Sequence, residues 1–312
     1  MPNFDPTYGY NLEQLLQIAP PCPPQDFAAL WQARYQRVMA LKPHPRLNPS
    51  EQYHPDFECY DFKYQSSNDI AIAGWALIPK KTPVTRGVVV GHGYGGREGP
   101  DFHIPIPGAA FLFPCFRGLS RSQRWPISAN PSFHVLHDID KRDQYILGGC
   151  AEDLWLAVSS LLELFPATAG HVAYLGISFG GGIGALALPW DARIQRAHFN
   201  VPSFGNHPLR LQLPTLGSAA ALQDYQRRHG NILATLSYYD AAVAAQYIQK
   251  PVHVALALAD PVVAPPGQFS IYNALPSEKK LFVLDKGHSD YPNKDVQEKA
   301  LLMELQDFFR SL

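Results

Sequence analysis

This chain carries little charge and no excess of either sign. Charged side chains make up 17% of its 312 residues, against a usual share of about 25%, and 26 basic residues stand beside 27 acidic ones. Binding to nucleic acid requires a clustered basic excess that neutralises phosphates, and the sequence has no such cluster. The composition therefore predicts that no nucleic acid is a partner.

Long apolar runs are also missing. No stretch approaches the roughly 18 apolar residues that a membrane span requires. The opening residues MPNFDPTYGYNLEQ do not show the basic segment followed by an apolar one that is typical of a secretory leader. We therefore expect a soluble, cytoplasmic protein with no membrane partner.

Cysteine is scarce, and the common metal-binding spacings are absent. Neither C-x-x-C nor H-E-x-x-H occurs, so the sequence indicates neither a zinc site nor a disulfide scaffold. We expect no metal and no cofactor. We also expect the four thiols to be reduced and mostly buried, namely Cys22, Cys59, Cys115 and Cys150.

Apolar residues and proline, by contrast, are abundant. Hydrophobic residues account for 46% of the chain, enough for a large core, and 29 residues are proline, nearly double the usual share of about 5%. The length fits two domains or one elaborated domain. Residues 1–66 are rich in proline and have one convincing helical pattern, which follows Asp26. This texture predicts an N-terminal arm packed on the core.

From residue 67 to residue 312, short apolar runs alternate with helical patterns. Strands that are apolar throughout are buried on both faces, as in a parallel sheet covered by helices. The sequence thus predicts an α/β domain over 67–312, with a helical insertion at about 204–246 over the carboxyl edge of the sheet. The predicted strands cover residues 70–79, 87–93, 109–116, 171–178, 194–201, 252–259 and 280–285.

The sharpest local motif is Gly176-Ile177-Ser178-Phe179-Gly180. A bare G-x-S-x-G pattern is expected by chance in about one such chain in ten, but here it joins an apolar run to a run of small residues. That context is the strand, turn and helix of a nucleophile elbow, where glycines leave room for a strained turn that projects a serine hydroxyl. We therefore predict that Ser178 is a nucleophile.

A serine nucleophile requires a histidine base and a carboxylate that fixes the histidine tautomer. In α/β-hydrolases these follow the serine in the order acid, then histidine. His288 follows the predicted strand KLFVLD, whereas His207, the other candidate, lies in the predicted insertion. Asp260 ends the strand VHVALALA and is preferred as the acid over its competitors Asp240, Asp285 and Asp290.

An oxyanion hole completes such a site with two backbone N–H groups. The amide of Phe179 follows the nucleophile, and the loop Gly91-His92-Gly93-Tyr94-Gly95-Gly96 would supply the amide of Tyr94. The same loop spells G-x-G-x-x-G, a dinucleotide-binding pattern. That pattern should open a helix, and the next residues REGPDFHIPIPG contain three prolines and no helical period, so we do not expect a nucleotide.

Together these segments resemble the acetyl xylan esterase and cephalosporin C deacetylase family of carbohydrate esterases, which are α/β-hydrolases. The resemblance runs from LEQLL and PPQDFAALWQARY through HGYGG, GISFGG and ALADPVVAPPGQFSIYN to the late Gly287-His288. It implies the same roles for Ser178, Asp260 and His288 and for the Tyr94 and Phe179 amides. It also implies a small-molecule ester substrate, such as an acetylated sugar, and a homo-oligomer.

Four positions depart from the family pattern. Phe179 stands where a glutamine is typical, and Cys115 and Leu119 replace the aspartate and the glutamine of Asp-x-Arg-Gly-Gln. Ser289 replaces the glutamate that follows the family's histidine. The sequence leads us to expect an esterase that removes small acyl groups, with Phe179 making the pocket wall larger and apolar. The alternatives are an α/β-hydrolase with another acyl or peptide-like substrate, and a non-catalytic binding protein of the same fold.

Overall fold

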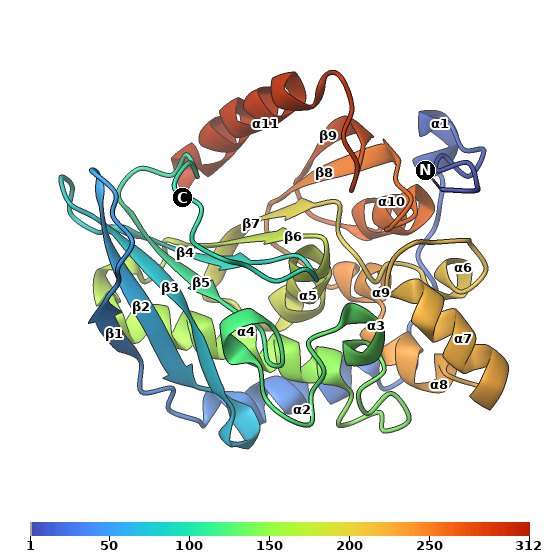
Figure 1. Cartoon of the computed structure of the whole chain (residues 1–312), viewed down its shortest axis with the longest axis horizontal. Helices are drawn as coiled ribbons and strands as arrows, with labels where there is room; N and C mark the ends of the chain where they lie inside the picture. The colour runs from blue at the N-terminus through green and yellow to red at the C-terminus, as the bar shows by residue number, and fades with distance from the viewer. Residues whose placement is uncertain (1) are drawn as a thin grey trace.

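The computed structural model describes residues 2–312, and a nine-stranded sheet runs through this part of the chain in the order β1-β2-β3-β5-β4-β6-β7-β8-β9 (Figure 1). β1 to β3 and β5 pair antiparallel, and from β5 onwards every pairing is parallel. The fold is that of an α/β-hydrolase, as the sequence predicted. The strands are β1 (Arg46–Pro49), β2 (Phe57–Gln65), β3 (Ala71–Pro79), β4 (Arg86–Gly91), β5 (Ala109–Pro114), β6 (Val172–Ile177), β7 (Ile194–Asn200), β8 (Val252–Ala259) and β9 (Lys279–Lys286).

The seven apolar runs of the sequence each form a strand, but β1 and β2 were missed. Both lie in the stretch 1–66 that the sequence analysis assigned to an arm, so the boundary at residue 66 does not separate that stretch from the sheet. β1 is the edge strand of the sheet and β2 is its neighbour. Most residues of β1 are exposed and most of β2 are only partly buried, and polar residues, as in FECYDFKYQ, conceal the apolar signal.

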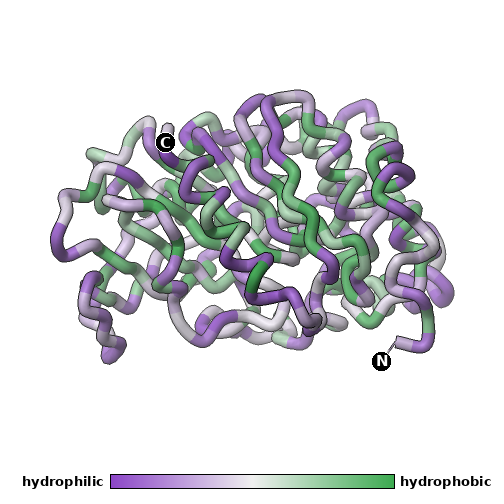
Figure 2. Tube along the Cα trace, turned by 90° about the horizontal axis from the view of Figure 1, so that it is seen from above, coloured by the Kyte–Doolittle hydropathy of each residue, from purple (hydrophilic) through white to green (hydrophobic). Residues whose placement is uncertain are grey.

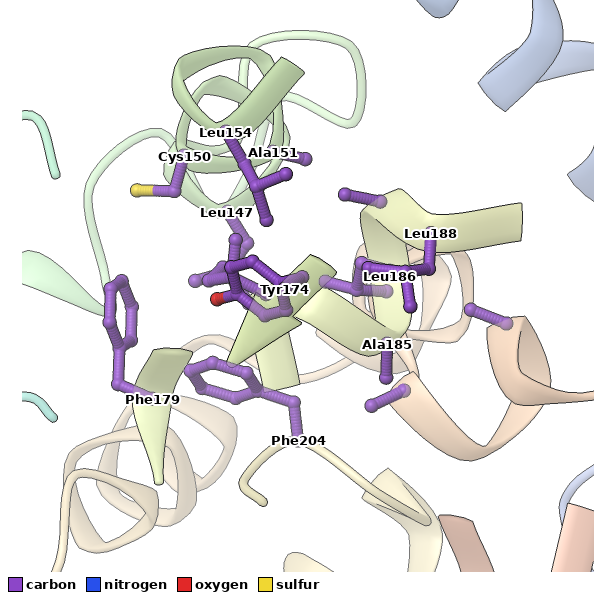
Figure 3. Packing of buried hydrophobic residues seen from close by; sticks show 14 of the residues in the cluster. Leu147, Cys150, Ala151, Leu154, Tyr174, Phe179, Ala185, Leu186, Leu188 and Phe204 are labelled. Atoms are coloured by element: carbon purple, nitrogen blue, oxygen red, sulfur yellow. The ribbon is translucent and has the colours of Figure 1, made fainter. Parts of the chain in front are cut away.

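Several helices cover one face of the sheet. α2 (Phe27–Met39) packs on α4 (Ile146–Leu164), which packs on α5 (Phe179–Ala187), and α5 in turn contacts α9 (Ala241–Ala245). α10 (Pro265–Ala274) packs on α9 and β8. Figure 3 shows the core on this side, with Tyr174 of β6 between side chains of α4 above and Phe179 and Phe204 below.

The opposite face is covered by α11 (Lys294–Phe308), which contacts β8 and β9 and stands apart above the sheet in Figure 1. A smaller apolar cluster lies there, built from Leu175, Val88 and Val90 of the sheet and Leu301 and Leu305 of α11. In Figure 2 hydrophobic stretches run through the middle of the molecule, and many of the outer turns are hydrophilic. None of the helices within residues 2–312 combines the length and the apolar content needed to cross a bilayer.

The connections between successive strands from β4 to β9 differ in their helix content. α4 lies between β5 and β6, α5 between β6 and β7, and α10 between β8 and β9. Between β7 and β8 the chain forms α6 (His207–Arg210), α7 (Ala219–His229), α8 (Leu233–Leu236) and α9, which is the predicted helical stretch. The connection from β4 to β5, residues 92–108, contains no helix in the described chain. Pro100, Pro105 and Pro107 explain this, since proline removes a helix donor and clashes with the preceding turn.

Candidate active site

Ser178 occupies the sharp turn between β6 and α5. Its φ of 51° and ψ of −110° place a non-glycine residue in a sparsely populated region, which is the backbone strain expected of a nucleophile elbow. Its backbone is fixed, because Ser178 N–H donates to Asn200 O at 2.8 Å. Gly180 is required nearby, since a Cβ there would lie 2.7 Å from the carbonyl carbon of Gly91. The turn therefore requires glycine at position 180.

The structure brings together the three side chains that the sequence singled out. His288 Nε2 lies 2.9 Å from Ser178 Oγ, and His288 Nδ1 lies 2.7 Å from Asp260 Oδ2. Asp260 follows β8 and His288 follows β9, so both reach the carboxyl edge of the sheet beside the elbow. Because a carboxylate only accepts, Nδ1–H donates to Asp260, and Nε2 keeps the lone pair that faces the serine hydroxyl.

Asp260 is fully buried and fully paired. Its Oδ1 accepts from the backbone N–H groups of Val262 at 2.8 Å and Val263 at 3.0 Å, and its Oδ2 accepts from Gln268 Nε2 at 2.9 Å. The pairing offsets the cost of burying a carboxylate. Gly287 lets the loop that carries His288 approach Asp260, since a Cβ there would collide with Asp260 Oδ2.

Gln268 is a site residue that the sequence analysis missed. It lies on α10 with no exposed surface, donates to Asp260 and to Val263 O, and accepts from Ala257 N–H at 3.0 Å. The available signal was the amide of Gln268 among the small and apolar residues at the start of the run PPGQFSIYN. A buried amide needs partners, and here its partners belong to the loop that carries the acid.

The N-terminal arm also reaches the acid. Asp260 N–H donates to Pro6 O at 2.9 Å, and Tyr8 Oη–H donates to Pro214 O at 2.8 Å, with Asp260 O at 3.4 Å. Burial, followed by the nearby charge of Asp260, raises the pKa of Tyr8, so this phenol stays a neutral donor. The arm thus helps to hold the strand end from which Asp260 projects.

The two backbone amides predicted for an oxyanion hole are free to bind a ligand. Among residues 2–312, neither Phe179 N–H nor Tyr94 N–H donates to any acceptor. Gly93 O accepts from His92 Nδ1 at 2.6 Å and from Gly96 N–H at 3.0 Å. In a trans peptide the C=O and the following N–H point in opposite directions, so Tyr94 N–H is turned away from His92. Gly93 itself lies beside Ser178, because a Cβ added to Gly93 would lie 3.9 Å from the Cβ of Ser178.

His92 is held at three points, all of them backbone groups. Besides the bond to Gly93 O, its Nε2 accepts from Phe116 N–H at 3.0 Å and its carbonyl accepts from Gly180 N–H at 2.9 Å. Burial lowers the pKa of His92 to about 4, so the ring is neutral, and its Nδ1–H tautomer is fixed by these partners. His92 therefore ties the Gly93–Tyr94 peptide to the elbow.

The ring of Tyr94 is anchored separately. Its Oη–H donates to His134 Nδ1 at 3.0 Å, and His134 Nε2–H donates to Arg117 O at 2.9 Å. Burial lowers the pKa of His134 to about 4, which keeps this ring neutral as well. Phe179 packs against the Tyr94 ring with 4.2 Å between ring centroids. The sequence gave no signal for His134, because its partners come from distant segments.

The expectation that Phe179 widens the pocket wall is wrong. The Phe179 side chain has no exposed surface and packs among the rings of His92, Tyr94, Phe116 and Phe204 (Figure 3). The first residue of α5 points its side chain into the core, because the elbow turns only its amide towards the site. Leu119 is buried too, whereas Ser289 donates to Gly287 O beside the base.

The competing candidates lie elsewhere. His207 Nε2–H donates to Tyr239 O in the core, and Asp240 caps α9 by accepting from Ala242 N–H. Asp290 pairs with Lys294, and Asp285 accepts from Gln297 Nε2. None of these groups contacts the Ser178 hydroxyl.

A strained serine, a histidine and a buried carboxylate at the carboxyl edge of a parallel sheet define an α/β-hydrolase with a serine-hydrolase site. The family model of acetyl xylan esterase matches residues 8–306. The chain therefore belongs to the acetyl xylan esterase family and is a carboxylic ester hydrolase.

Solved structures agree on the fold. Acetyl xylan esterase 1 from a Thermoanaerobacterium species is 21% identical with a TM-score of 0.79, over 97% of this chain and 99% of that one. An acetyl xylan esterase from a Paenibacillus species is 23% identical with a TM-score of 0.80, over 95% and 99%. Acylaminoacyl peptidase from Pyrococcus horikoshii is more distant, at 16% identity and a TM-score of 0.64, over 82% of this chain and 42% of that one.

Proposed function

We propose that this protein removes acetyl and other small acyl groups from hydroxylated substrates, such as acetylated sugars, through an acyl-enzyme on Ser178. The observation that carries the proposal is the hydrogen-bonded series from Ser178 Oγ through His288 to Asp260, with distances of 2.9 and 2.7 Å. The family assignment supports the choice of an acetyl ester.

In the first half of the reaction, His288 Nε2 takes the Ser178 proton while Oγ attacks the ester carbonyl carbon. The Tyr94 and Phe179 amides stabilise the negative oxygen of the tetrahedral intermediate. His288 then gives its proton to the departing alcohol oxygen, and the carbon–oxygen bond breaks. Asp260 holds the tautomer and stabilises the imidazolium.

In the second half, His288 removes a proton from water, and the resulting hydroxide attacks the acyl carbon. Collapse of the second intermediate returns a proton to Ser178 and releases the carboxylic acid. These residues complete the cycle without requiring a cofactor.

Ser178→Ala tests the proposal. We expect hydrolysis of 4-nitrophenyl acetate to fall by about 10⁴-fold or more with the melting temperature unchanged, because the nucleophile is lost and no packing is disturbed. Ser203→Ala is the matched control, since Ser203 Oγ lies 3.5 Å from Ser178 Oγ and does not contact His288. Ser203→Ala should retain labelling by a fluorophosphonate, and Ser178→Ala should lose it. The opposite result would make Ser203 the nucleophile, and labelling of neither serine in the wild type would favour a binding protein.

A series of acyl chain lengths separates the small-acyl esterase from a hydrolase of other acyl or peptide-like substrates. We expect kcat/KM to fall steeply beyond propionate. A preference for long or aromatic acyl groups would reject the acetyl assignment. The buried positions of Phe179 and Leu119 remove the sequence-based reason for favouring a larger acyl group. Light scattering of the purified enzyme tests the homo-oligomer that the family resemblance implies.

A further inference from the structure

Two neighbouring cavities lie on the α11 side of the sheet, next to the proposed site. The larger, about 620 Å³, is lined by the loop at 92–105, the carboxyl ends of β4, β6 and β7, and α11. The second, about 420 Å³, is lined by the loop that carries His288, by β7 and by α11. Both are bordered by Ile177, Asn200, Glu298 and Leu301, so they form one depression, which we call the α11 groove.

The α11 groove exists because the β4 to β5 connection has no helix. In most parallel crossovers a helix covers the sheet between the two strands. Here the proline-containing loop runs along the rim of the groove and leaves this part of the sheet open. Ile177, the last residue of β6, is 44% exposed although the other residues of this strand are buried. The missing helix thus leaves open space beside Ile177, the residue that precedes Ser178.

The residues where the two cavities meet have the chemistry of a sugar site. Asn200 and Glu298 border both cavities, and within residues 2–312 neither side chain has a hydrogen-bond partner, whereas Lys294 is already paired with Asp290. An amide and a carboxylate together offer donors and acceptors for hydroxyl groups. Ile177 and Leu301 offer aliphatic surface for the C–H face of a ring. Of the lysine and arginine side chains that line the groove within residues 2–312, Arg97 pairs with Asp101 and Lys294 with Asp290. This leaves Lys286 as a single unpaired cation, not the cluster that a phosphate or sulfate ester would need.

The α11 groove also borders both loops that handle the reacting ester. Gly93, which precedes the Tyr94 amide, lines the larger cavity, and His288 lines the smaller one. The departing alcohol must lie next to His288 Nε2, because that atom protonates its oxygen. We propose that the α11 groove binds the alcohol part of the substrate, a pyranose or a similar ring with several hydroxyl groups, through Asn200 and Glu298. This inference rests on the proposed function.

The test compares a large and a small alcohol. For a mono-acetylated xylobiose, we expect Asn200→Ala and Glu298→Ala each to raise KM about 10-fold, the loss of one hydrogen bond to a sugar hydroxyl. With 4-nitrophenyl acetate, kcat/KM of the Glu298→Ala enzyme should stay within about 2-fold of the wild type, because Glu298 is not among the hydrogen-bond partners of Ser178 and His288. Glu304→Ala is the matched control on the same helix, since Glu304 faces His253 rather than the groove, and it should change neither substrate.

Inhibition gives a second readout that needs no turnover of the sugar ester. Free xylobiose should compete with 4-nitrophenyl acetate in the wild type and compete about 10-fold more weakly in the Glu298→Ala enzyme. Unchanged KM and unchanged inhibition in both variants would overturn the groove assignment, as would an equal loss on both substrates. Retained hydrolysis by Ser178→Ala would instead overturn the proposed function, so the two failures are distinguishable.

Discussion

The two faces of the sheet differ in how tightly side chains pack next to Ser178. On the α5 face, Tyr174, Phe179, Phe199 and Phe204 have no exposed surface, and His92 and His134 lock the Tyr94 loop against this packing. On the α11 face, one helix and a proline-rich loop leave a groove next to the elbow. The contrast teaches that transition-state donors need a rigid support, whereas recognition of an alcohol needs space.

The largest effect expected from this contrast is on stability. Phe179→Ala should lower the free energy of unfolding by about 3 to 5 kcal/mol, because it leaves a cavity in a fully packed core. Leu302→Ala on α11, which lines the groove and is only partly buried, should cost less than about 1.5 kcal/mol. Urea titrations of the two variants check this. Equal losses would show that the two faces are equally well packed.

The next effect is on catalysis. His92→Ala should lower kcat for 4-nitrophenyl acetate by about 100-fold with little change in KM, because the Tyr94 amide loses its orientation and acts mainly in the transition state. His92→Asn should recover part of the rate, since its amide can donate to Gly93 O in place of Nδ1. His253→Asn, a buried histidine that contacts Glu304 on the α11 side, is the control. A uniform fall in all three variants would point to general destabilisation.

A third prediction concerns pH and stability. Burial lowers the pKa of His92 and His134 to about 4 and of His207 to about 3, against an ordinary value of 6.5. Between pH 6.5 and 4 the unfolded chain therefore binds more protons than the folded one, and stability falls as the pH falls through this window. Burial raises the pKa of Asp240 to about 6, which acts in the opposite direction.

We expect the histidines to outweigh Asp240, with a net loss of about 3 kcal/mol between pH 7 and 5.5. Denaturant titrations across this range measure it. A flat profile would mean that the packed face does not keep its histidines neutral.

The smallest effect should come from the N-terminal arm, which contacts the backbone of Asp260 through Pro6 and that of Pro214 through Tyr8. Tyr8→Phe removes the hydroxyl that donates to Pro214 O and should cost about 1 kcal/mol of stability and less than about 3-fold in kcat. Melting temperature and steady-state rates measure both. A much larger loss of kcat at unchanged stability would show that the arm controls the position of Asp260.

The sequence was most informative where a polar or ionisable residue follows the end of a predicted strand. Ser178, Asp260 and His288 each follow an apolar run, and the parallel sheet brings such ends to one edge. The edge strand β1 and its neighbour β2 were missed because most of their residues are exposed or only partly buried and therefore need not be apolar. Gln268 and His134 were missed because their roles come from partners in other segments, which no local pattern records.

What the sequence by itself determined is the α/β fold, the strained turn at Ser178 and the order of Ser178, Asp260 and His288 along the chain, since periodicity, glycine placement and chain order are local properties. Only the tertiary structure decided that Phe179 turns its ring into the core, that His92 orients the Tyr94 amide and that a groove opens under α11. Each of these depends on which distant segments pack together, and packing is a property of the folded chain.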